Sequence, residues 1–219
     1  NIKRIRYTTS HPKDMTQDLI DVYKDSIKLM PLVHLPVQSG SNKVLKLMNR
    51  KHSIKEYFKI FEKLKGINSN IEFSSDFIIG YPGETDNDFE KTLFIMNNVK
   101  FINSFSFIYS ARPGTPAFNL EKVNQEIAKE RLITFQKAAE KIKLDYRKSL
   151  INKTSQVLFE NKMKTNNKYF GRDEFFNSVI VESNENLQGK IKSVKILNGN
   201  QNTLFGKMIL HSRQENYAA

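Results

Sequence analysis

An aspartate inside an apolar run is the first residue of this sequence that suggests chemistry. Asp76 stands in the stretch SSDFIIGYPGET, residues 74–85, directly before three large apolar residues. These neighbours predict a buried strand, where a carboxylate without a partner is costly. Gln38 raises the same question, because it follows the apolar stretch LVHLPV at residues 32–37. Buried polar groups need hydrogen-bond partners, so we expect a ligand with hydroxyl groups to satisfy both side chains.

Small, polar or Gly/Pro-bearing stretches follow four predicted strands. They are SHP at 10–12, QSGS at 38–41, GYPGET at 80–85 and SARPGTPA at 110–117. In parallel α/β folds, ligands bind beyond the C-terminal ends of the strands. Glycine in such loops lets the backbone approach a ligand closely. The four stretches therefore predict one shared binding site.

Each candidate residue in or near these stretches also has a structural alternative. The GYPG of residues 80–83 can simply shape a tight turn, and Glu84 can simply cap the next helix. His34, within an apolar strand, is more typical of a satisfied core histidine than of a ligand. Arg50 and Arg112 can equally be exposed residues of a helix end and a loop.

Several kinds of site are excluded by the sequence. GYPGET lacks the Gly-Lys-Ser/Thr ending of a phosphate-binding P-loop. Because there is no cysteine, this chain supplies no disulfide, no cysteine nucleophile and no thiolate metal ligand. The 4 histidines are scattered, and no Ser-His-Asp arrangement can be argued from spacing. The residues alone therefore predict a ligand-binding α/β part without defining its reaction.

Strand and helix patterns alternate up to about residue 121. Strands are expected at 4–9, 32–38, 71–80 and 101–110, with helices at 16–26, 42–48, 53–66 and 86–99. Ser53 with Glu56 is typical of a capping box at a helix start. About four strand–helix units in series predict an α/β fold with a parallel sheet or partial (β/α) barrel. Because the first strand would have an exposed edge, we expect further chain before Asn1 or another subunit to cover it.

The pattern changes after residue 121. Residues 122–150 predict a long basic helix, and residues 151–215 predict a small five-stranded all-β barrel of the oligonucleotide-binding (OB) kind. Residues 122–168 contain 12 Lys and Arg against 5 Asp and Glu, within a chain of net charge +12. This charge favours a polyanionic partner such as nucleic acid, although a solvated lysine-rich helix explains it equally well. We therefore expect three parts, 1–121, 122–150 and 151–215.

No apolar run is long enough to span a bilayer, and the first residues show no basic-then-apolar leader. We therefore expect a cytoplasmic protein with no membrane partner.

Five ordered motifs resemble those of the tRNA methylthiotransferases of the radical S-adenosylmethionine (SAM) class. They are TTSHP, HLPVQSGS, LMNRKHS, SSDFIIGYPGETDNDFEKT and FSFIYSARPGTPA. Within that family they are most similar to members that methylthiolate N6-isopentenyladenosine at C2, next to the tRNA anticodon. The main alternatives are the sibling that modifies a ribosomal protein, and a cluster-less RNA-binding protein or subunit without catalysis of its own. The resemblance implies a partial radical-SAM barrel followed by a TRAM-type RNA-binding β-barrel.

The resemblance also implies roles for individual residues. Gln38 and Asp76 would hold the ribose hydroxyls of SAM, and Arg50 would pair with its carboxylate. The backbone around Gly80 and Gly83 would lie near the adenine. Arg112 and Gly114 would line the opening of the same SAM site.

The family holds a 4Fe–4S cluster with a three-cysteine motif and a second cluster in another domain, and such clusters need thiolate ligands. This chain has none. The resemblance therefore implies a C-terminal part of the enzyme that is inactive alone, with no catalytic or metal-binding residue of its own. The electron donor and the sulfur source stay unidentified, and we expect the intact enzyme to be a monomer.

The β-barrel would bind the tRNA anticodon stem-loop. Aromatic and cationic side chains suit bases and backbone, and lysines suit phosphates. The candidates are Lys162, Lys164, Lys168, Tyr169, Phe170 and Arg172. Phe175 and Phe176 offer further aromatic rings, although the two can equally divide between core and surface as any strand pair would.

Overall fold

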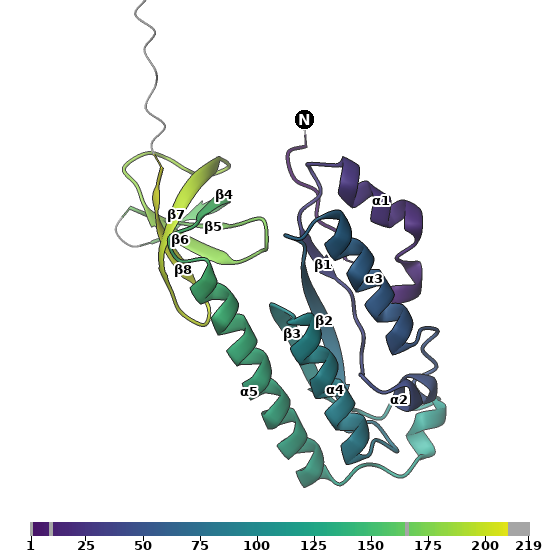
Figure 1. Ribbon diagram of the computed structural model, residues 1–219. Helices are drawn as coiled ribbons and strands as arrows, with labels where there is room; N and C mark the ends of the chain where they lie inside the picture. The colour runs from purple at the N-terminus through teal and green to yellow at the C-terminus, as the bar shows by residue number, and fades with distance from the viewer. Residues whose placement is uncertain (1, 9–10, 165–166, 210–219) are drawn as a thin grey trace, which may run out of the picture. The chain divides into compact units, whose positions relative to one another are not determined.

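The computed structural model describes residues 2–8, 11–164 and 167–209. The chain divides into two compact units, residues 1–143 and 144–219. Helix α5 (Gln125–Ser149) crosses this division. Figure 1 shows helices and a sheet in the first unit, and the strands of the second unit after α5. Within the described ranges, no helix is both long enough and apolar enough to cross a membrane.

The first unit alternates strands and helices, as the sequence predicted. A parallel sheet has the strand order β1 (Leu32–His34), β2 (Glu72–Ile79), β3 (Asn103–Ile108). Its helices are α1 (Gln17–Asp25), α2 (Asn42–Leu47), α3 (Ile54–Ile67) and α4 (Asp86–Val99), with short 3₁₀ helices η1 (Pro12–Asp14) and η2 (Pro116–Asn119). The central register places Asp76 beside Phe105.

The sheet has three strands where the sequence predicted about four. In the described part of the first segment, only two isolated parallel bridges form, Ile5 with Leu29 and Thr8 with His34. Ile2 and Ile5 are exposed. This segment has a neighbouring strand on one side only, and its apolar side chains are exposed. Further strand pairing would therefore bury little apolar surface, and only isolated bridges form.

Alternation along β2 gives the sheet two different faces. Phe73, Phe77 and Ile79 are fully buried in the core of the first unit. Phe77 packs on Phe135 of α5, with ring centroids 4.6 Å apart. Asp76 points to the opposite face, because successive side chains of a strand alternate. The buried face anchors the strand, and the other face carries Asp76.

Two capping boxes start the helices that follow the loops of interest. The predicted box of Ser53 and Glu56 is confirmed at the start of α3. A second box, Thr85 with Asp88, starts α4. Since Thr85 is the cap, Glu84 has a different role from the capping alternative.

Glu84 is half of a buried ion pair that ties α5 to the turn after β2. Arg131 donates from Nη1 to Glu84 Oε1 at 2.9 Å and from Nη2 to Asp86 Oδ1 at 2.6 Å. Glu84 Oε1 also accepts the Gly80 backbone N–H at 3.0 Å. Burial raises the pKa of Glu84, while Gly80 and Arg131 act in the opposite direction. The pair therefore holds the GYPG turn through a carboxylate that is costly to leave alone.

The second unit is a closed barrel in the order β4-β5-β6-β8-β7. Its strands are β4 (Thr154–Lys162), β5 (Lys168–Arg172), β6 (Ser178–Glu182), β7 (Ile191–Gly199) and β8 (Leu204–Met208). All neighbours are antiparallel except β6 and β8, which are parallel. Val157, Phe159, Val179, Val194 and Ile196 fill the interior. The predicted five-stranded barrel is confirmed.

Phe175 and Phe176 lie in the turn between β5 and β6 rather than in a strand. Asp173 organises this turn: its Oδ1 accepts the backbone N–H groups of Phe175 at 2.9 Å and Asn177 at 2.8 Å. Phe176 has φ of 66° and a side chain on the surface. The hydrogen-bonded turn ends the strand pattern that the sequence suggested at this point.

Replacing Arg131 by Ala should destabilise the first unit by about 3–5 kcal/mol, because Glu84 would stay buried without its partner. Lys129→Ala is the matched control on the same helix, since Lys129 makes an exposed pair with Glu126 at 3.0 Å. That control should cost under about 0.5 kcal/mol. Chemical unfolding followed by circular dichroism measures both. Equal effects of the two substitutions would contradict the buried role of Arg131.

Asp173 should titrate far above an ordinary aspartate. Burial raises its pKa to about 6, although hydrogen bonds from Asn177 and Phe175 lower it. The folded protein therefore holds this proton more tightly than the unfolded chain. Its contribution to stability is complete below about pH 4 and is lost as the pH rises through about 6.

The measurement is ¹³C NMR of the Asp173 carboxyl group between pH 3 and 8, with Asp173→Asn identifying the signal. We expect a midpoint near 6. A midpoint near 4, the range of a solvated aspartate, would show that burial does not govern this carboxyl group.

Candidate cofactor cavity and nucleic-acid face

The backbone brings Gln38 and Asp76 together. Gln38 follows β1, where its N–H donates to the Asp76 carbonyl at 3.0 Å and its carbonyl accepts from Ile78 N–H at 3.0 Å. Gln38 has φ of 72°, in the left-handed region. Such a conformation costs a non-glycine residue roughly 1–3 kcal/mol and is enriched at functional sites. Two polar side chains distant in sequence thus meet at one edge of the sheet.

Gln38 and Asp76 line a cavity of about 900 Å³. Ligand pockets in proteins have volumes of roughly 300–1,000 Å³. Polar groups of this cavity come from segments far apart in the sequence: Gln38, Arg50, Asp76, Tyr81, Tyr109 and Arg112. Apolar walls complete it, among them Leu47, Ile78 and Phe107. An apolar cavity with a few converging polar groups is the usual form of a small-molecule site.

Asp76 lies between a histidine and an arginine. His34 Nε2 is 3.6 Å from Asp76 Oδ2, and His34 Nδ1 is 3.0 Å from the hydroxyl oxygen of Ser74. The Ser74 contact orients the imidazole, as the core alternative for His34 supposed. Burial lowers the pKa of Arg50, and the charge of Asp76 raises it. A half-buried guanidinium in this position gains from a further carboxylate partner.

Two tyrosines of the cavity were missed by the sequence reasoning. The rings of Tyr81 and Tyr109 meet edge to face with centroids 4.8 Å apart. Tyr81 donates its hydroxyl to the Leu47 carbonyl at 3.1 Å. The hydroxyl of Tyr109 is buried and has no hydrogen-bond partner. The signal for both was present, because Tyr81 follows directly on a predicted strand and Tyr109 lies at the end of another.

Gly80 and Gly83 are not among the residues that line the cavity. Gly80 has φ of 70°, and a Cβ there would lie 2.8 Å from the Ala128 Cβ, so glycine is required by α5. The carbonyl of Gly83 accepts from Lys43 Nζ at 2.8 Å. Their roles near an adenine stay predictions, while the neighbouring Tyr81 does line the cavity.

Arg112 lies in the loop after β3. Arg112 lines the cavity, and its carbonyl accepts the N–H of Thr115 at 3.3 Å and the hydroxyl of Thr115 at 2.8 Å. Gly114 has φ of 81° in the same turn. The loop is therefore held by local hydrogen bonds with the Arg112 side chain exposed.

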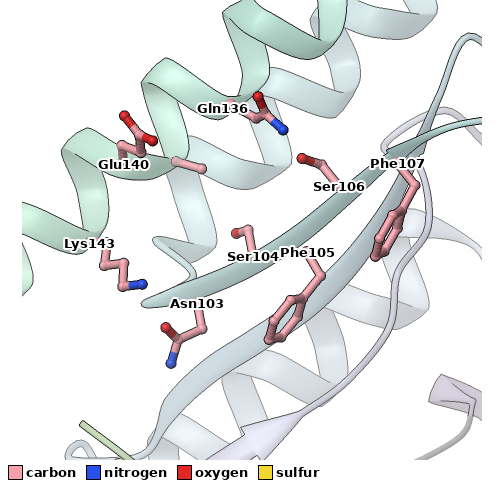
Figure 2. A pocket seen from close by; sticks show the side chains of 9 residues that line it. Asn103, Ser104, Phe105, Ser106, Phe107, Gln136, Glu140 and Lys143 are labelled. Carbon is pink, nitrogen blue, oxygen red and sulfur yellow. The ribbon is translucent and has the colours of Figure 1, made fainter. Parts of the chain in front are cut away.

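A second cavity of about 420 Å³ lies between β3 and α5. Figure 2 shows Ser104 and Ser106 turned toward α5 and the rings of Phe105 and Phe107 turned away from it. The ring of Phe105 contacts His34, and Phe107 lines the larger cavity. The smaller cavity contains none of the predicted cofactor residues, so β3 separates it from the candidate site.

The cavity residues have the chemistry that binding SAM requires, and their individual roles stay predictions. SAM carries a ribose diol, for which Asp76 and Gln38 are suitable partners, and a carboxylate, for which Arg50 and Arg112 are suitable. The unpartnered Tyr109 hydroxyl offers one more polar contact. The residues do not fit an iron–sulfur cluster, because the sequence contains no cysteine and the described residues contain no group of three His, Asp or Glu that could hold a metal.

On the barrel, Arg172 is the centre of an aromatic stack. Its guanidinium carbon lies 5.3 Å from the ring centroid of Phe170 and 4.1 Å from that of Phe176. Arg172 Nε is 3.3 Å from Glu160 Oε1. Phe176 is 45% exposed, so the stack reaches the surface. Stacked aromatic and guanidinium planes can bind unpaired nucleotide bases.

Tyr169 requires a correction. Its side chain is only 3% exposed and belongs to the barrel core, so its ring cannot stack on a base. Side chains alternate between interior and surface along β5, and Tyr169 falls on the interior side. Lys162 lies on the surface with its ammonium 6.0 Å from that ring centroid, Lys164 is exposed, and Lys168 pairs with Glu182 at 3.4 Å.

Strand β8 extends this face in a way that the sequence did not predict. The register pairs Phe170 with Ile180, and Ile180 with Phe205. Directly paired residues on neighbouring strands point to the same side. Phe205 is 39% exposed, and Lys207 follows two residues later on the same side. The outer face therefore runs from the Arg172 stack across three strands.

A family model described as the radical SAM superfamily matches residues 1–95. The chain is 58% identical over 214 residues to the tRNA-2-methylthio-N(6)-dimethylallyladenosine synthase of Pelagibacter ubique. This alignment covers 98% of this chain and 48% of that protein. It is 47% identical over 208 residues to the protein of the same name from Wolbachia of Culex pipiens, covering 94% of this chain and 47% of that protein.

Among solved structures, coproporphyrinogen III oxidase from Escherichia coli, a radical SAM enzyme, matches with a TM-score of 0.52 and 14% identity. That match covers 78% of this chain and 46% of the oxidase, and at this identity it concerns the fold alone. The chain spans about half the length of the curated relatives that it matches. From this similarity, residues 1–95 match the radical SAM superfamily, and nearly the whole chain is homologous to about half of each of the two synthases named above.

Proposed function

We propose that this chain supplies the SAM-binding cavity and the RNA-binding barrel of an enzyme that methylthiolates N6-isopentenyladenosine in tRNA at C2. The observation that carries the proposal is the convergence of Gln38, Arg50 and Asp76 on one cavity. The names of the relatives support tRNA, rather than a ribosomal protein, as the substrate. The thiolates that hold the family's iron–sulfur clusters would come from outside these 219 residues.

In this proposal the cavity residues bind and orient SAM. The carboxylate of Asp76 accepts hydrogen bonds from the ribose hydroxyls, and Gln38 adds an amide beside them. His34 steadies the Asp76 carboxylate from the other side. Arg50 pairs with the SAM carboxylate, and its partial burial strengthens that contact because little water competes. SAM supplies the radical chemistry of the superfamily, and these side chains supply its placement.

The barrel would hold the anticodon stem-loop in the cytoplasm. The Arg172 stack offers planar groups for unpaired bases. Lys162, Lys164 and Lys207 are exposed and suit backbone phosphates. Base stacking and phosphate contacts together are typical of proteins that bind unpaired RNA.

Replacing Asp76 by Asn should weaken SAM binding about 10- to 100-fold, since it removes a charge-assisted hydrogen-bond acceptor. Isothermal titration of the 219-residue chain with SAM is the measurement. Glu72→Gln is the matched control: it removes an equal charge from the same strand but lies outside the cavity lining. SAM affinity that is equal in the two variants would overturn the role of Asp76.

Replacing Arg172 by Ala should weaken binding of an isopentenyl-adenosine anticodon stem-loop about three- to tenfold and reduce its salt slope by about 1. Arg172→Lys keeps the charge and loses the planar stack, so it should restore the slope without restoring full affinity. Lys190→Ala removes an exposed charge before β7 as the control. An unchanged salt slope in Arg172→Ala would count against a phosphate contact there.

A further inference from the structure

The cavity of about 900 Å³ has two chemically different sets of lining residues. The polar set includes Gln38, Arg50 and Asp76, to which the proposed function assigns SAM. The apolar set comes from the end of α2 and the residue after it, from β2, from β3 and from the start of η2. It includes Leu47, Met48, Ile78, Phe107, Pro116 and Ala117. The ligand chemistry of the polar set does not account for the apolar set.

The sheet register places part of the apolar set next to Asp76. Asp76 is paired with Phe105, and Ile78 is paired with Phe107. Directly paired residues on neighbouring strands point to the same side, and so do residues two apart along one strand. Ile78 and Phe107 therefore lie roughly 6.5 Å further along the strands than Asp76, toward their C-terminal ends. In parallel α/β folds this is the edge where ligands bind.

Two members of the apolar set have large side chains that the fold leaves uncovered. Phe107 is 59% exposed and Leu47 is 43% exposed. Single exposed apolar residues are common on protein surfaces. These two, however, line one concave cavity, where a ligand can cover both at once. Because covering apolar side chains removes their surface from water, the cavity favours a ligand with an apolar group.

The wall around these two side chains is packed in advance of binding. Met48, Ile78 and Tyr109 pack against a small buried cluster, which consists of Val44, Tyr81 and Ala117. The ordering of loose side chains is one of the costs of binding, and a packed wall avoids most of it. A preformed apolar wall can therefore distinguish a ligand with a hydrocarbon group from one without it.

SAM alone leaves part of this cavity without a complement. Its ribose diol and carboxylate need polar partners, which Gln38, Arg50 and Asp76 can supply. The volume of about 900 Å³ is near the upper end of the roughly 300–1,000 Å³ range of small-molecule sites. A second group can therefore enter beside SAM. The adenine of SAM is the competing occupant of the apolar set, and the SAM affinity of a Phe107 variant distinguishes the two.

From these observations we infer that Leu47, Ile78 and Phe107 receive the isopentenyl group of the substrate adenosine. The choice of this substrate rests on the proposed function, whereas the apolar chemistry rests on the cavity itself. The isopentenyl group is a branched hydrocarbon without a hydrogen-bonding atom, so apolar side chains complement it fully. Phe107 is then a specificity-determining residue, because an unmodified adenosine would leave its ring exposed to water.

The experiment compares two anticodon stem-loops that differ only in the isopentenyl group, each titrated into the 219-residue chain with saturating SAM. We expect the modified stem-loop to bind about ten- to 100-fold more tightly, from burial of the hydrocarbon. Phe107→Ala should reduce this preference about three- to tenfold by weakening only the modified stem-loop. Phe107→Leu should keep most of it.

Phe94→Ala is the matched control. Phe94 is 60% exposed, as Phe107 is, but it lies on α4 outside the cavity lining. Its removal should leave the preference unchanged. In the same complexes, nuclear Overhauser effects should join the isopentenyl methyl groups to the Phe107 ring.

The outcomes separate this inference from the proposed function. Equal affinity of the unsubstituted chain for the two stem-loops would overturn the inference alone. Equal weakening of both stem-loops by Phe107→Ala would do the same, because it would indicate a general RNA contact. A loss of SAM affinity in Phe107→Ala would assign the ring to the cofactor instead. If neither stem-loop binds, the proposed function is contradicted, and the inference fails with it.

Discussion

The first unit depends on two backbone hydrogen bonds between Gln38 and β2. They join Gln38 to Asp76 and Ile78 and hold Gln38 in a left-handed conformation. Without them, the chain after β1 could continue in an extended direction and carry its amide away from the carboxylate. The strain is tolerated because the surrounding core is fully packed: Leu35, Val37 and Phe77 on either side are completely buried. Geometry that a polar site needs is thus maintained by apolar packing.

Packing and a buried polar contact also fix the other edge of the site. The turn after β2 must bring Tyr81 to the cavity while α5 passes close to Gly80. The buried pair of Glu84 and Arg131 fixes that approach, and the absence of a Cβ at Gly80 makes it sterically possible. A buried ion pair adds little net stability by itself. Its value here is positional, because Glu84 Oε1 accepts from both the Gly80 N–H and Arg131 Nη1, and this fixes the turn against α5.

In the barrel, alternation along each strand separates the core residues from the outward-facing residues. Interior positions of its strands bury Val157, Phe159 and Val194, and the alternate positions are left for binding. Closure aligns the outward residues of neighbouring strands, which is why Phe170 and Phe205 belong to one face although 35 positions separate their numbers. Arg172 then links that face to the Phe176 turn through its two ring contacts.

Most of the secondary-structure elements and the two central site candidates could be predicted from the sequence, because they depend on local patterns. Period-2 and helical patterns located nearly every element, the box of Ser53 and Glu56 marked α3, and composition separated the barrel from the α/β part. Asp76 and Gln38 stood out because polar residues at buried strand positions need partners. The motifs, by resemblance, identified the family. These inferences need only neighbours in the chain or the chemistry of a side chain.

What the sequence could not determine is which distant residues meet. Tyr169 and Phe170 are adjacent aromatics, and only the closed barrel decides that one is interior and the other outside. Glu84 and Arg131 lie 47 positions apart, and nothing local announces their pairing. His52 is an ordinary histidine until the fold buries it beside Arg50. Patterns along the chain set the elements and the candidate chemistry, whereas burial and long-range pairing depend on packing in three dimensions.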